Sequence, residues 1–272
     1  PGSANPISGG IVAMKTFGRR VDDMIIKAVG VKFALGENPK TVYNDKNSTP
    51  VTRMATAALI REALFKAKKY SEDLKEAEEN PELEKPEFDI KCEALIPLIR
   101  RKVKAHFHCH RADDIFTAIR ISKEFDLDCV LVHTTEGHLI GDLLGKERIS
   151  AIVGPIICDR SKPEMKNLST KNAAELWKSG VKISLCTDHP VIPAQYLPMS
   201  AAVAVKGGLP FDAAIKALTI DAAEIIGISE RVGSIEVGKD ADFSLFDGNP
   251  LDVMVSPKAV IVDGKIIIGL KK

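Results

Sequence analysis

The chain has 272 residues, with 38 Lys and Arg against 37 Asp and Glu, so its formal net charge is +1. This balance gives no reason to expect a nucleic acid or an anionic membrane surface as a partner. Hydrophobic residues make up 45% of the chain, yet no apolar run reaches the roughly 20 residues that a membrane span needs. The length suffices for one sizeable hydrophobic core.

The chain begins with PGSANPISGG, which has no initiator Met and lacks the basic and apolar segments of a signal peptide. We therefore expect a sequence that starts within a longer protein. The five cysteines are odd in number and form no Cys-x-x-Cys pair. Free, buried thiols in a reducing compartment are the simplest interpretation, and they favour a cytoplasmic location.

Short apolar runs alternate with amphipathic stretches along most of the chain. The runs are almost continuously apolar, as is typical of parallel strands covered on both faces. The expected strands are Gly10–Lys15, Val31–Glu37, Val103–Cys109, Cys129–Thr134, Ile149–Pro155 and Val181–Asp188. The expected helices are Arg19–Val29, Thr52–Tyr70, Ile90–Arg101, Ala112–Phe125, Asn172–Ser179 and Thr219–Ile228, with a shorter one near Gly137–Gly145.

This alternation predicts an α/β protein with a parallel sheet. No Gly-x-Gly-x-x-Gly sequence follows a strand, so a (β/α)8 barrel of the TIM type is favoured over a dinucleotide-binding sheet. We expect the barrel to occupy residues 1–228. Residues 229–272 contain short strands and Val-Gly and Asp-Gly turns, which indicate a small β domain. The acidic segment 71–87 is expected to be solvated and to have no chemical role.

Polar side chains gather where the expected strands end. In a (β/α)8 barrel these carboxyl ends form the rim that holds the catalytic groups. All six histidines lie between residues 106 and 189. Four strands deliver an imidazole or a carboxylate to the rim, namely Glu37, His108, His133 and Asp188.

A mixture of imidazole and carboxylate groups is typical of a divalent metal site, with Zn²⁺ favoured and Mn²⁺ or Fe²⁺ also suitable. The metal would activate water, and Asp188 would take a proton from that water and pass it to a leaving nitrogen. His108 and His133 are the expected histidine ligands. His106, deeper on the same strand, suits packing or a supporting contact. His110 could face a substrate or be exposed.

Two further residues have competing interpretations. His138 could simply begin a helix, and Asp188 could cap a turn. The position of Asp188 at a strand end beside the histidines favours catalysis.

Five motifs together resemble the amidohydrolase superfamily, in its imidazolonepropionase-related and prolidase-like branch. They are GENPK, HCHRADDI, VHTTEGH, TDHP and VGSIEVGKDADFSLFDG, and they extend over essentially the whole chain. The resemblance implies one or two divalent metal ions at the mouth of a (β/α)8 barrel. It also implies that the C-terminal β segment completes a small β-sandwich.

The resemblance assigns roles to individual residues. His108 matches the ligand of the fifth strand, and His133 matches that of the sixth. Asp188 matches the eighth-strand aspartate, which contacts the metal and shuttles the proton. Glu37 matches the fourth-strand position that bridges two metals in binuclear members, with Lys40 as a weaker candidate. His110, Arg111 and His189 would contact the substrate.

One departure concerns the His-x-His pair that the superfamily carries at the end of its first strand. The histidines at 106, 108 and 110 belong to the fifth-strand region, so the chain would supply about strands 3–8 of the barrel. We therefore expect a homo-oligomer, or association with a missing N-terminal segment.

The expected function is metal-dependent hydrolysis of an amide or other C–N bond in a small molecule, such as a cyclic amide or a peptide-like substrate. Two alternatives stay open: a deaminase of the same superfamily, and a non-catalytic scaffold. A simple sugar-phosphate enzyme would explain neither the histidines nor the added β segment.

Overall fold

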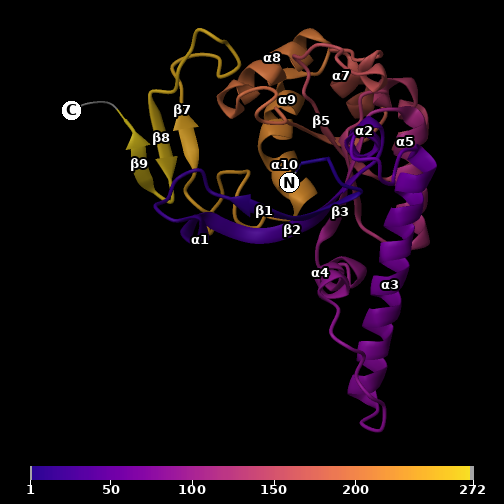
Figure 1. Cartoon of the computed structure of the whole chain (residues 1–272). Coiled ribbons are helices and arrows are strands. Elements are labelled where there is room, and N and C mark those ends of the chain that lie inside the picture. Colours follow the sequence, from indigo (N-terminus) through magenta and orange to yellow (C-terminus); the bar gives the residue numbers. More distant parts are fainter. Residues whose placement is uncertain (1, 270–272) are drawn as a thin grey trace. The chain divides into compact units, whose positions relative to one another are not determined.

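The computed structural model describes residues 2–269 as an α/β protein (Figure 1). Its strands are β1 (Ile7–Met14), β2 (Ile25–Ala34), β3 (Lys104–Cys109), β4 (Cys129–His133), β5 (Ser150–Val153), β6 (Lys182–Leu185), β7 (Phe243–Leu245), β8 (Ala259–Val262) and β9 (Lys265–Ile268). Its α-helices are α1 (Val21–Met24), α2 (Glu37–Asn44), α3 (Arg53–Glu79), α4 (Ile90–Ile99), α5 (Ala112–Glu124), α6 (Gly141–Leu144), α7 (Asn172–Lys178), α8 (Leu197–Lys206), α9 (Phe211–Leu218) and α10 (Ile220–Ile226). The 3₁₀ turns are η1 (Gly137–Leu139), η2 (Gly145–Glu147), η3 (Pro163–Met165) and η4 (Ala194–Tyr196).

The chain forms two compact units that are not simple halves of the sequence. The first unit contains the residues up to Val12 together with Ala28–Leu131. The second contains Ala13–Lys27 and the residues from Val132 onward. The predicted division at residue 228 stays a prediction. None of the helices within residues 2–269 is both long and apolar enough to cross a bilayer.

The core of the first unit forms around parallel strands. β2 pairs with β3 from Gly30 opposite Lys104 to Ala34 opposite His108. The fully buried rings of Phe33 and Phe107 stack across this pair with their centroids 4.8 Å apart. A stacked, buried aromatic pair contributes on the order of 0.5–1.5 kcal/mol beyond the burial of its area. The predicted parallel sheet is confirmed here.

The prediction of a helix at Arg19–Val29 is wrong. Only the four residues of α1 are helical, and β2 already begins at Ile25. The Lys15 amide donates to the Met24 carbonyl, and the Ala34 amide donates to the Pro6 carbonyl. These bonds at opposite ends show that β1 and β2 run antiparallel as a hairpin. The β-branched run Ile25, Ile26 and Val29 favours an extended backbone, and this preference prevailed over the apparent helical spacing.

The strand predicted at Val31–Glu37 also ends early. β2 stops at Ala34, Gly36 has a positive φ of 83°, and Glu37 begins α2. Glycine takes such a φ without steric cost, so the chain can turn sharply between the strand and the helix.

Two helices of the first unit, α3 and α4, pack against each other. Figure 1 shows the C-terminal half of α3 and the segment before α4 extending away from β2 and β3. Leu64, Ala67 and Leu98 are fully buried in this helix pair. The Tyr70 hydroxyl donates to Glu93 Oε1 at 2.7 Å. The acidic segment that we expected to be solvated lies at the far end of this pair, and residues 71–79 continue α3.

The second unit has a parallel pair and a separate antiparallel sheet. β5 pairs with β6 from Ser150 opposite Lys182 to Val153 opposite Leu185. β7, β8 and β9 form a three-stranded antiparallel sheet in that order, as the short strands and turns of the C-terminal segment predict. The helices α8 and α9, which cover residues 197–218, were not foreseen. All five cysteines are free thiols.

A buried lysine ties the end of β1 to this C-terminal segment. Lys15 Nζ lies 2.9 Å from Asp240 and 2.8 Å from Asp263, and it also pairs with Asp242. The Lys15 side chain is only 8% exposed. Burial alone lowers the pKa of Lys15, but the hydrogen bonds to the three carboxylates outweigh it and raise the pKa. Lys15 therefore stays charged and holds the cluster together.

Candidate active site

Strand β3 carries histidines at alternate positions, because every second side chain of a strand points to the same face. His106, His108 and the following His110 are each about 3% exposed. His106 fits because residue 30 is glycine: a Cβ there would lie 2.8 Å from the Lys104 carbonyl oxygen and 2.9 Å from His106 Nε2. Burial lowers the pKa of His106 to about 4, with help from Lys32 and Lys104. His106 is therefore a neutral packing residue.

The other two histidines lie beside each other. The rings of His108 and His110 meet edge to face, with centroids 4.8 Å apart. His108 Nε2 lies 3.3 Å from Nδ2 of the side chain of Asn38, which is in the first turn of α2. Asn38 in turn contacts the Ser3 hydroxyl at 2.5 Å. The structure thus puts His110, which the sequence suggested could be exposed, in the interior next to His108.

Strand β4 ends in a strained backbone at His133. His133 has a φ of 73° and Thr134 a φ of 49°. Left-handed backbone is uncommon outside glycine and is disfavoured for β-branched residues, so such strain is concentrated at functional sites. His133 is 2% exposed, and its Nδ1 lies 2.6 Å from the carbonyl oxygen of Gly154. This contact suits Nδ1–H donating to the carbonyl, which leaves Nε2 as the nitrogen able to bind a metal.

Asn172 fastens the loop that follows β4. Its Nδ2 donates to the Thr134 carbonyl at 2.9 Å, and its Oδ1 accepts from the His138 amide at 2.8 Å. Asn172 is 4% exposed, at the start of α7. In the same loop, Glu136 accepts a hydrogen bond from Asn167 at 2.8 Å. The backbone after His133 is therefore held by the buried side chain of Asn172.

Glu37 lies in a network of charges. Its two carboxylate oxygens accept from Arg53 at 2.8 Å and from Lys40 at 2.9 Å. Partial burial on its own raises the pKa of Glu37, but these two cations outweigh it and lower the pKa. Arg53 also reaches Asp114 at 3.1 Å. As a metal ligand, Glu37 would have to exchange one of these cations for the ion.

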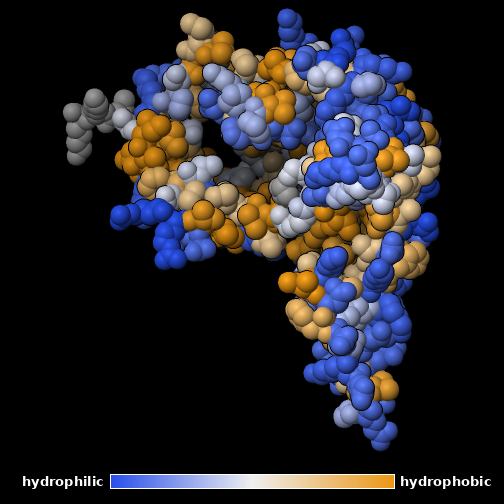
Figure 2. Space-filling view, in the orientation of Figure 1, coloured by the Kyte–Doolittle hydropathy of each residue, from blue (hydrophilic) through white to orange (hydrophobic). Residues whose placement is uncertain are grey.

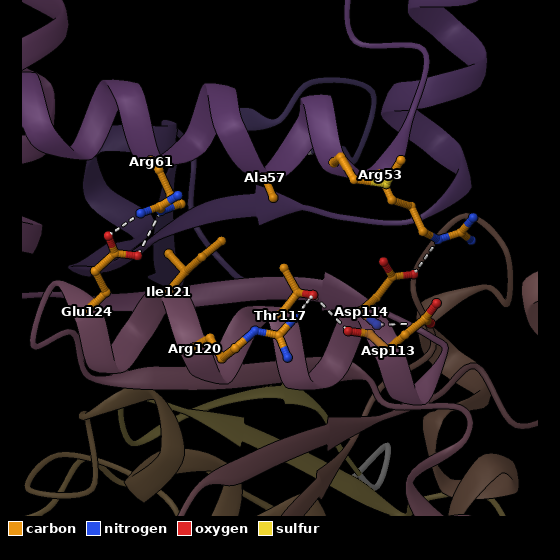
Figure 3. A pocket seen from close by; sticks show the side chains of 10 residues that line it. Arg53, Ala57, Arg61, Asp113, Asp114, Thr117, Arg120, Ile121 and Glu124 are labelled. Carbon is orange, nitrogen blue, oxygen red and sulfur yellow. Dashed lines mark hydrogen bonds and ion pairs between the residues drawn. The ribbon is translucent and has the colours of Figure 1, made fainter.

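Figure 3 shows the depression that adjoins this network between α3 and α5. It has a volume of about 540 Å³. Arg53 pairs there with Asp114, and Arg61 holds Glu124 through two bonds of 2.8 and 2.6 Å. Its charges mostly satisfy one another, so the depression resembles a salt-bridged helix contact more than a ligand site.

The residues after β6 lie in a loop. β6 ends at Leu185, three residues before Asp188. Asp188 has a φ of 51°, and its carbonyl accepts from the Val191 amide at 2.9 Å. Asp188 and His189 are both exposed. The pKa of nearby Cys158 is raised, first by burial and then by the charges of Asp159 and Asp188. Asp188 is thus an accessible carboxylate near the end of a parallel strand.

Arg111 lies at the start of α5, directly after His110. It holds Asp113 through bonds of 3.0 and 2.9 Å, and it is partly exposed. Arg111 thus lies at the surface, paired with Asp113. Its contact with a substrate stays a prediction.

Sequence reasoning missed two supporting residues, Gly154 and Asn172. Gly154 has a φ of 138°, and a Cβ on it would overlap the Cys186 carbonyl oxygen. A glycine followed by proline after an apolar strand is a signal that could have indicated this special backbone. Nothing in the position of Asn172 along the sequence could have indicated that its side chain makes two hydrogen bonds to a loop 34–38 residues earlier.

Comparison with known proteins places these features in a family. The sequence pattern described as "Amidohydrolase family" matches residues 90–267. The chain belongs to the amidohydrolase family. A crystal structure of an amidohydrolase from Thermotoga maritima MSB8 is similar at 41% identity and a TM-score of 0.95, covering 99% of this chain and 70% of that one.

Two curated proteins extend the comparison. The amidohydrolase tasK of Hapsidospora irregularis is 28% identical over 290 residues. The match covers 97% of this chain but only 29% of the Hapsidospora protein. An imidazolonepropionase of Shouchella clausii is 31% identical over 113 residues, which span 36% of this chain and 25% of that enzyme. The chain thus spans less than a third of the length of either protein.

A prolidase structure shares the fold alone, at 18% identity and a TM-score of 0.51 over 62% of this chain. The resemblance to an amidohydrolase superfamily with imidazolonepropionase-related and prolidase-like members is confirmed.

Proposed function

We propose that this chain carries the main catalytic residues of a metal-dependent hydrolase that cleaves an amide or another C–N bond in a small molecule. The observation that carries the proposal is the contact between His133 Nδ1 and the Gly154 carbonyl. Metal-binding histidines usually donate their second ring nitrogen to such an acceptor, which fixes the tautomer and the direction of the ring.

The donor set suits a divalent ion. His108, His110 and His133 are buried imidazoles at or directly after strand ends, and Asp188 adds a carboxylate near the end of another strand. Imidazole with carboxylate is a ligand set for zinc, and also for manganese or iron. We propose His108, His133 and Asp188 as ligands, and His110 as a further candidate ligand in addition to its expected contact with substrate. One or two ions could bind, with Glu37 joining only in the second case.

A bound divalent ion of this kind polarises a carbonyl and lowers the pKa of water toward neutrality. The residues of the chain then orient the reacting groups and move protons. Gly154 holds His133 in one tautomer. Asp188 takes a proton from the attacking water and returns it to the leaving nitrogen, as a general base and then a general acid. His110, Arg111 and His189 are proposed to contact the substrate.

We also propose that the parallel strands belong to a (β/α)8 barrel of the TIM type and that β7–β9 belong to a small β-sandwich. The parallel pairs β2–β3 and β5–β6 and the intervening helices support the barrel. The antiparallel sheet of β7, β8 and β9 supports the small β-sandwich.

The Asp188→Asn variant tests the proposed mechanism. Asparagine is similar in shape but cannot take the proton, so turnover should fall by about 10²–10⁴-fold, while the melting temperature stays unchanged because Asp188 is exposed. Asp212→Asn, an exposed aspartate on α9, is the matched control and should keep full activity. A panel of cyclic amides and dipeptides is suitable, with metal content measured by elemental analysis.

Turnover of Asp188→Asn at the level of Asp212→Asn would contradict the mechanism. Release of ammonia from an aminated heterocycle, with no cleavage of amides, would favour the deaminase instead. Absence of bound metal after reconstitution would favour the scaffold.

A further inference from the structure

The segment that joins β2 to α2 holds both the backbone and the ring of His108. The Leu35 amide donates to the His108 carbonyl at 3.0 Å, one residue past the point where Ala34 lies opposite His108. Three residues later, Asn38 Nδ2 lies 3.3 Å from His108 Nε2. Because Gly36 has a positive φ, the chain can turn sharply between these two contacts and bring the Asn38 side chain to the ring.

The contact with Asn38 determines which ring nitrogen of His108 is available to a metal. A side-chain amide has a donor at one end and an acceptor at the other, so after a half-turn Asn38 can accept from Nε2–H. The Ser3 hydroxyl, 2.5 Å from Asn38 Nδ2, can follow that turn because a hydroxyl both donates and accepts. With the hydrogen on Nε2, the lone pair of His108 lies on Nδ1, which is then the nitrogen able to bind a metal.

The short helix α2, which carries Asn38, gains little from apolar burial. Of the described residues Glu37–Asn44 that form α2, Pro39 alone is buried. The surface over α2 is mostly hydrophilic (Figure 2). A helix of eight residues is marginal without tertiary contacts, so the position of α2 depends on its polar contacts.

Arg53, the first residue of α3, supplies the strongest of these contacts. Its Nη2 donates to Glu37 Oε1 at 2.8 Å, and its Nε donates to Asp114 Oδ2 at 3.1 Å. Glu37 begins α2, and Asp114 lies in the first turn of α5, which follows β3. We call Arg53, Glu37 and Asp114 the Arg53 clamp, because Arg53 ties together the helices that follow two paired strands.

The burial of the Arg53 clamp makes it a firm tie. The side chain of Asp114 is 4% exposed, that of Glu37 19% and that of Arg53 22%. Removal of one partner from a buried ion pair is costly, whereas exposed pairs contribute little. The residue that follows Glu37 is Asn38, so the clamp restrains the helix start that presents Asn38 to His108.

We propose that Asn38 and the Arg53 clamp position His108 for metal binding: Asn38 fixes the tautomer and direction of the ring, and the clamp fixes Asn38. Both Asn38 and Arg53 are positioning residues, since they act through His108. The inference rests on the proposed function, which makes His108 a ligand. With one ion bound, Glu37 keeps both of its cations and serves to hold α2.

Zinc affinity of the full chain, measured by competition with a chelator, tests the role of Asn38. Asn38→Leu keeps the size of the side chain but loses both ends of the amide, so affinity should fall by about 10–100-fold. Asn38→Asp still accepts from Nε2–H and should bind zinc at least as tightly as the unmodified chain. Asn44→Leu, an exposed position of the same helix, is the matched control and should leave the affinity unchanged.

Nitrogen-15 NMR of the histidine rings gives a readout that needs no metal. The signals of His108 are those that disappear in the variant His108→Gln. In metal-free Asn38→Asp, His108 should carry its hydrogen on Nε2, because a carboxylate accepts but cannot donate. In Asn38→Leu, the two tautomers of His108 should exchange, since neither is selected.

A double-mutant cycle tests the Arg53 clamp. Arg53→Met should weaken zinc binding by about tenfold, at the low end for residues that support a metal ligand. It should weaken binding little further in the Asn38→Leu background, because Arg53 acts through Asn38. Arg61→Met is the control, since Arg61 lies on the same helix but holds Glu124 of α5, and it should leave zinc affinity unchanged.

The possible failures of these tests are distinguishable. Equal zinc affinity of Asn38→Leu and the unmodified chain, or equal tautomer populations in Asn38→Leu and Asn38→Asp, would overturn the inference and leave the proposed function standing. An equal effect of Arg53→Met in both backgrounds would overturn the role of the clamp, because general destabilisation acts in this way. An unmodified chain that binds no zinc would overturn the proposed function, and the inference with it.

Discussion

The cluster around Lys15 allows a quantitative prediction for the variant Lys15→Met. Methionine keeps most of the apolar stem but removes the ammonium group that contacts three carboxylates. The carboxylate oxygens of Asp240, Asp242 and Asp263 lie within 4.8 Å of one another, so they would repel each other once Lys15 is gone. Removal of one partner from a buried ion pair costs about 3–5 kcal/mol.

The cost should be at the low end of this range, about 3 kcal/mol, for two reasons. Asp263 is 52% exposed, so water can solvate it, and Asp240 keeps an ion pair with Arg231 at 2.7 Å. For a protein of this size a loss of about 3 kcal/mol lowers the melting temperature by roughly 6–10 °C.

Differential scanning calorimetry of the unmodified chain and of Lys15→Met measures this loss. Lys182→Met is the control, because Lys182 pairs with Glu224 at the surface, where an ion pair contributes at most about 1 kcal/mol. Millimolar calcium should restore part of the melting temperature of Lys15→Met but not raise that of the unmodified chain, in which Lys15 already neutralises the carboxylates. Equal melting temperatures for the two variants would refute the reasoning.

Two further predictions concern His106 and Gly154. Because the pKa of His106 is lowered to about 4 in the folded chain, the unfolded chain takes up a proton first, so stability should be full above about pH 6.5 and fall by about 3 kcal/mol as the pH drops to 4. Urea unfolding at several pH values checks this, and His106→Gln, which cannot titrate, should lose less; parallel curves for the two proteins would contradict it. Gly154→Ala forces a Cβ onto the Cys186 carbonyl and displaces the acceptor of His133, so metal affinity should fall by about 10–100-fold in a competition titration with a chelator. Gly180→Ala has a similarly positive φ with open space around it, and it should leave metal affinity unchanged, whereas an equal loss in both variants would show that backbone strain alone is responsible.

The parallel strands were predictable because their apolar runs are buried on both faces and show little of the spacing that would also fit a helix. β3 and β4 begin and end within one residue of the expected bounds. The first forty residues were harder. Their β-branched residues recur at spacings compatible with a helix, but these residue types also favour an extended backbone, and the pairing of Ile25–Ala34 with neighbouring strands reinforces that preference.

The same limit applies to the candidate site. Histidines at alternate positions of a strand share a face, so the residue types and their strand ends could be read from the sequence. The contacts that orient them could not. The Gly154 carbonyl and the Asn172 side chain come from segments 21 and 38 residues beyond the groups that they hold, His133 and Thr134. Such pairings depend on tertiary packing, which no local pattern encodes.

During synthesis, the end of the β1–β2 hairpin can pack only after its partners much later in the chain have been made. Residues 13–27 leave the ribosome before residues 132 onward but belong to the same compact unit as those later residues. Lys15 precedes Asp242 by 227 residues and Asp263 by 248. At a ribosomal rate of about 5–20 residues per second, Lys15 waits roughly 11–50 s for its partners. Until then the hairpin end stays solvated, so this stretch offers nascent-chain chaperones and proteases a defined interval in which to act.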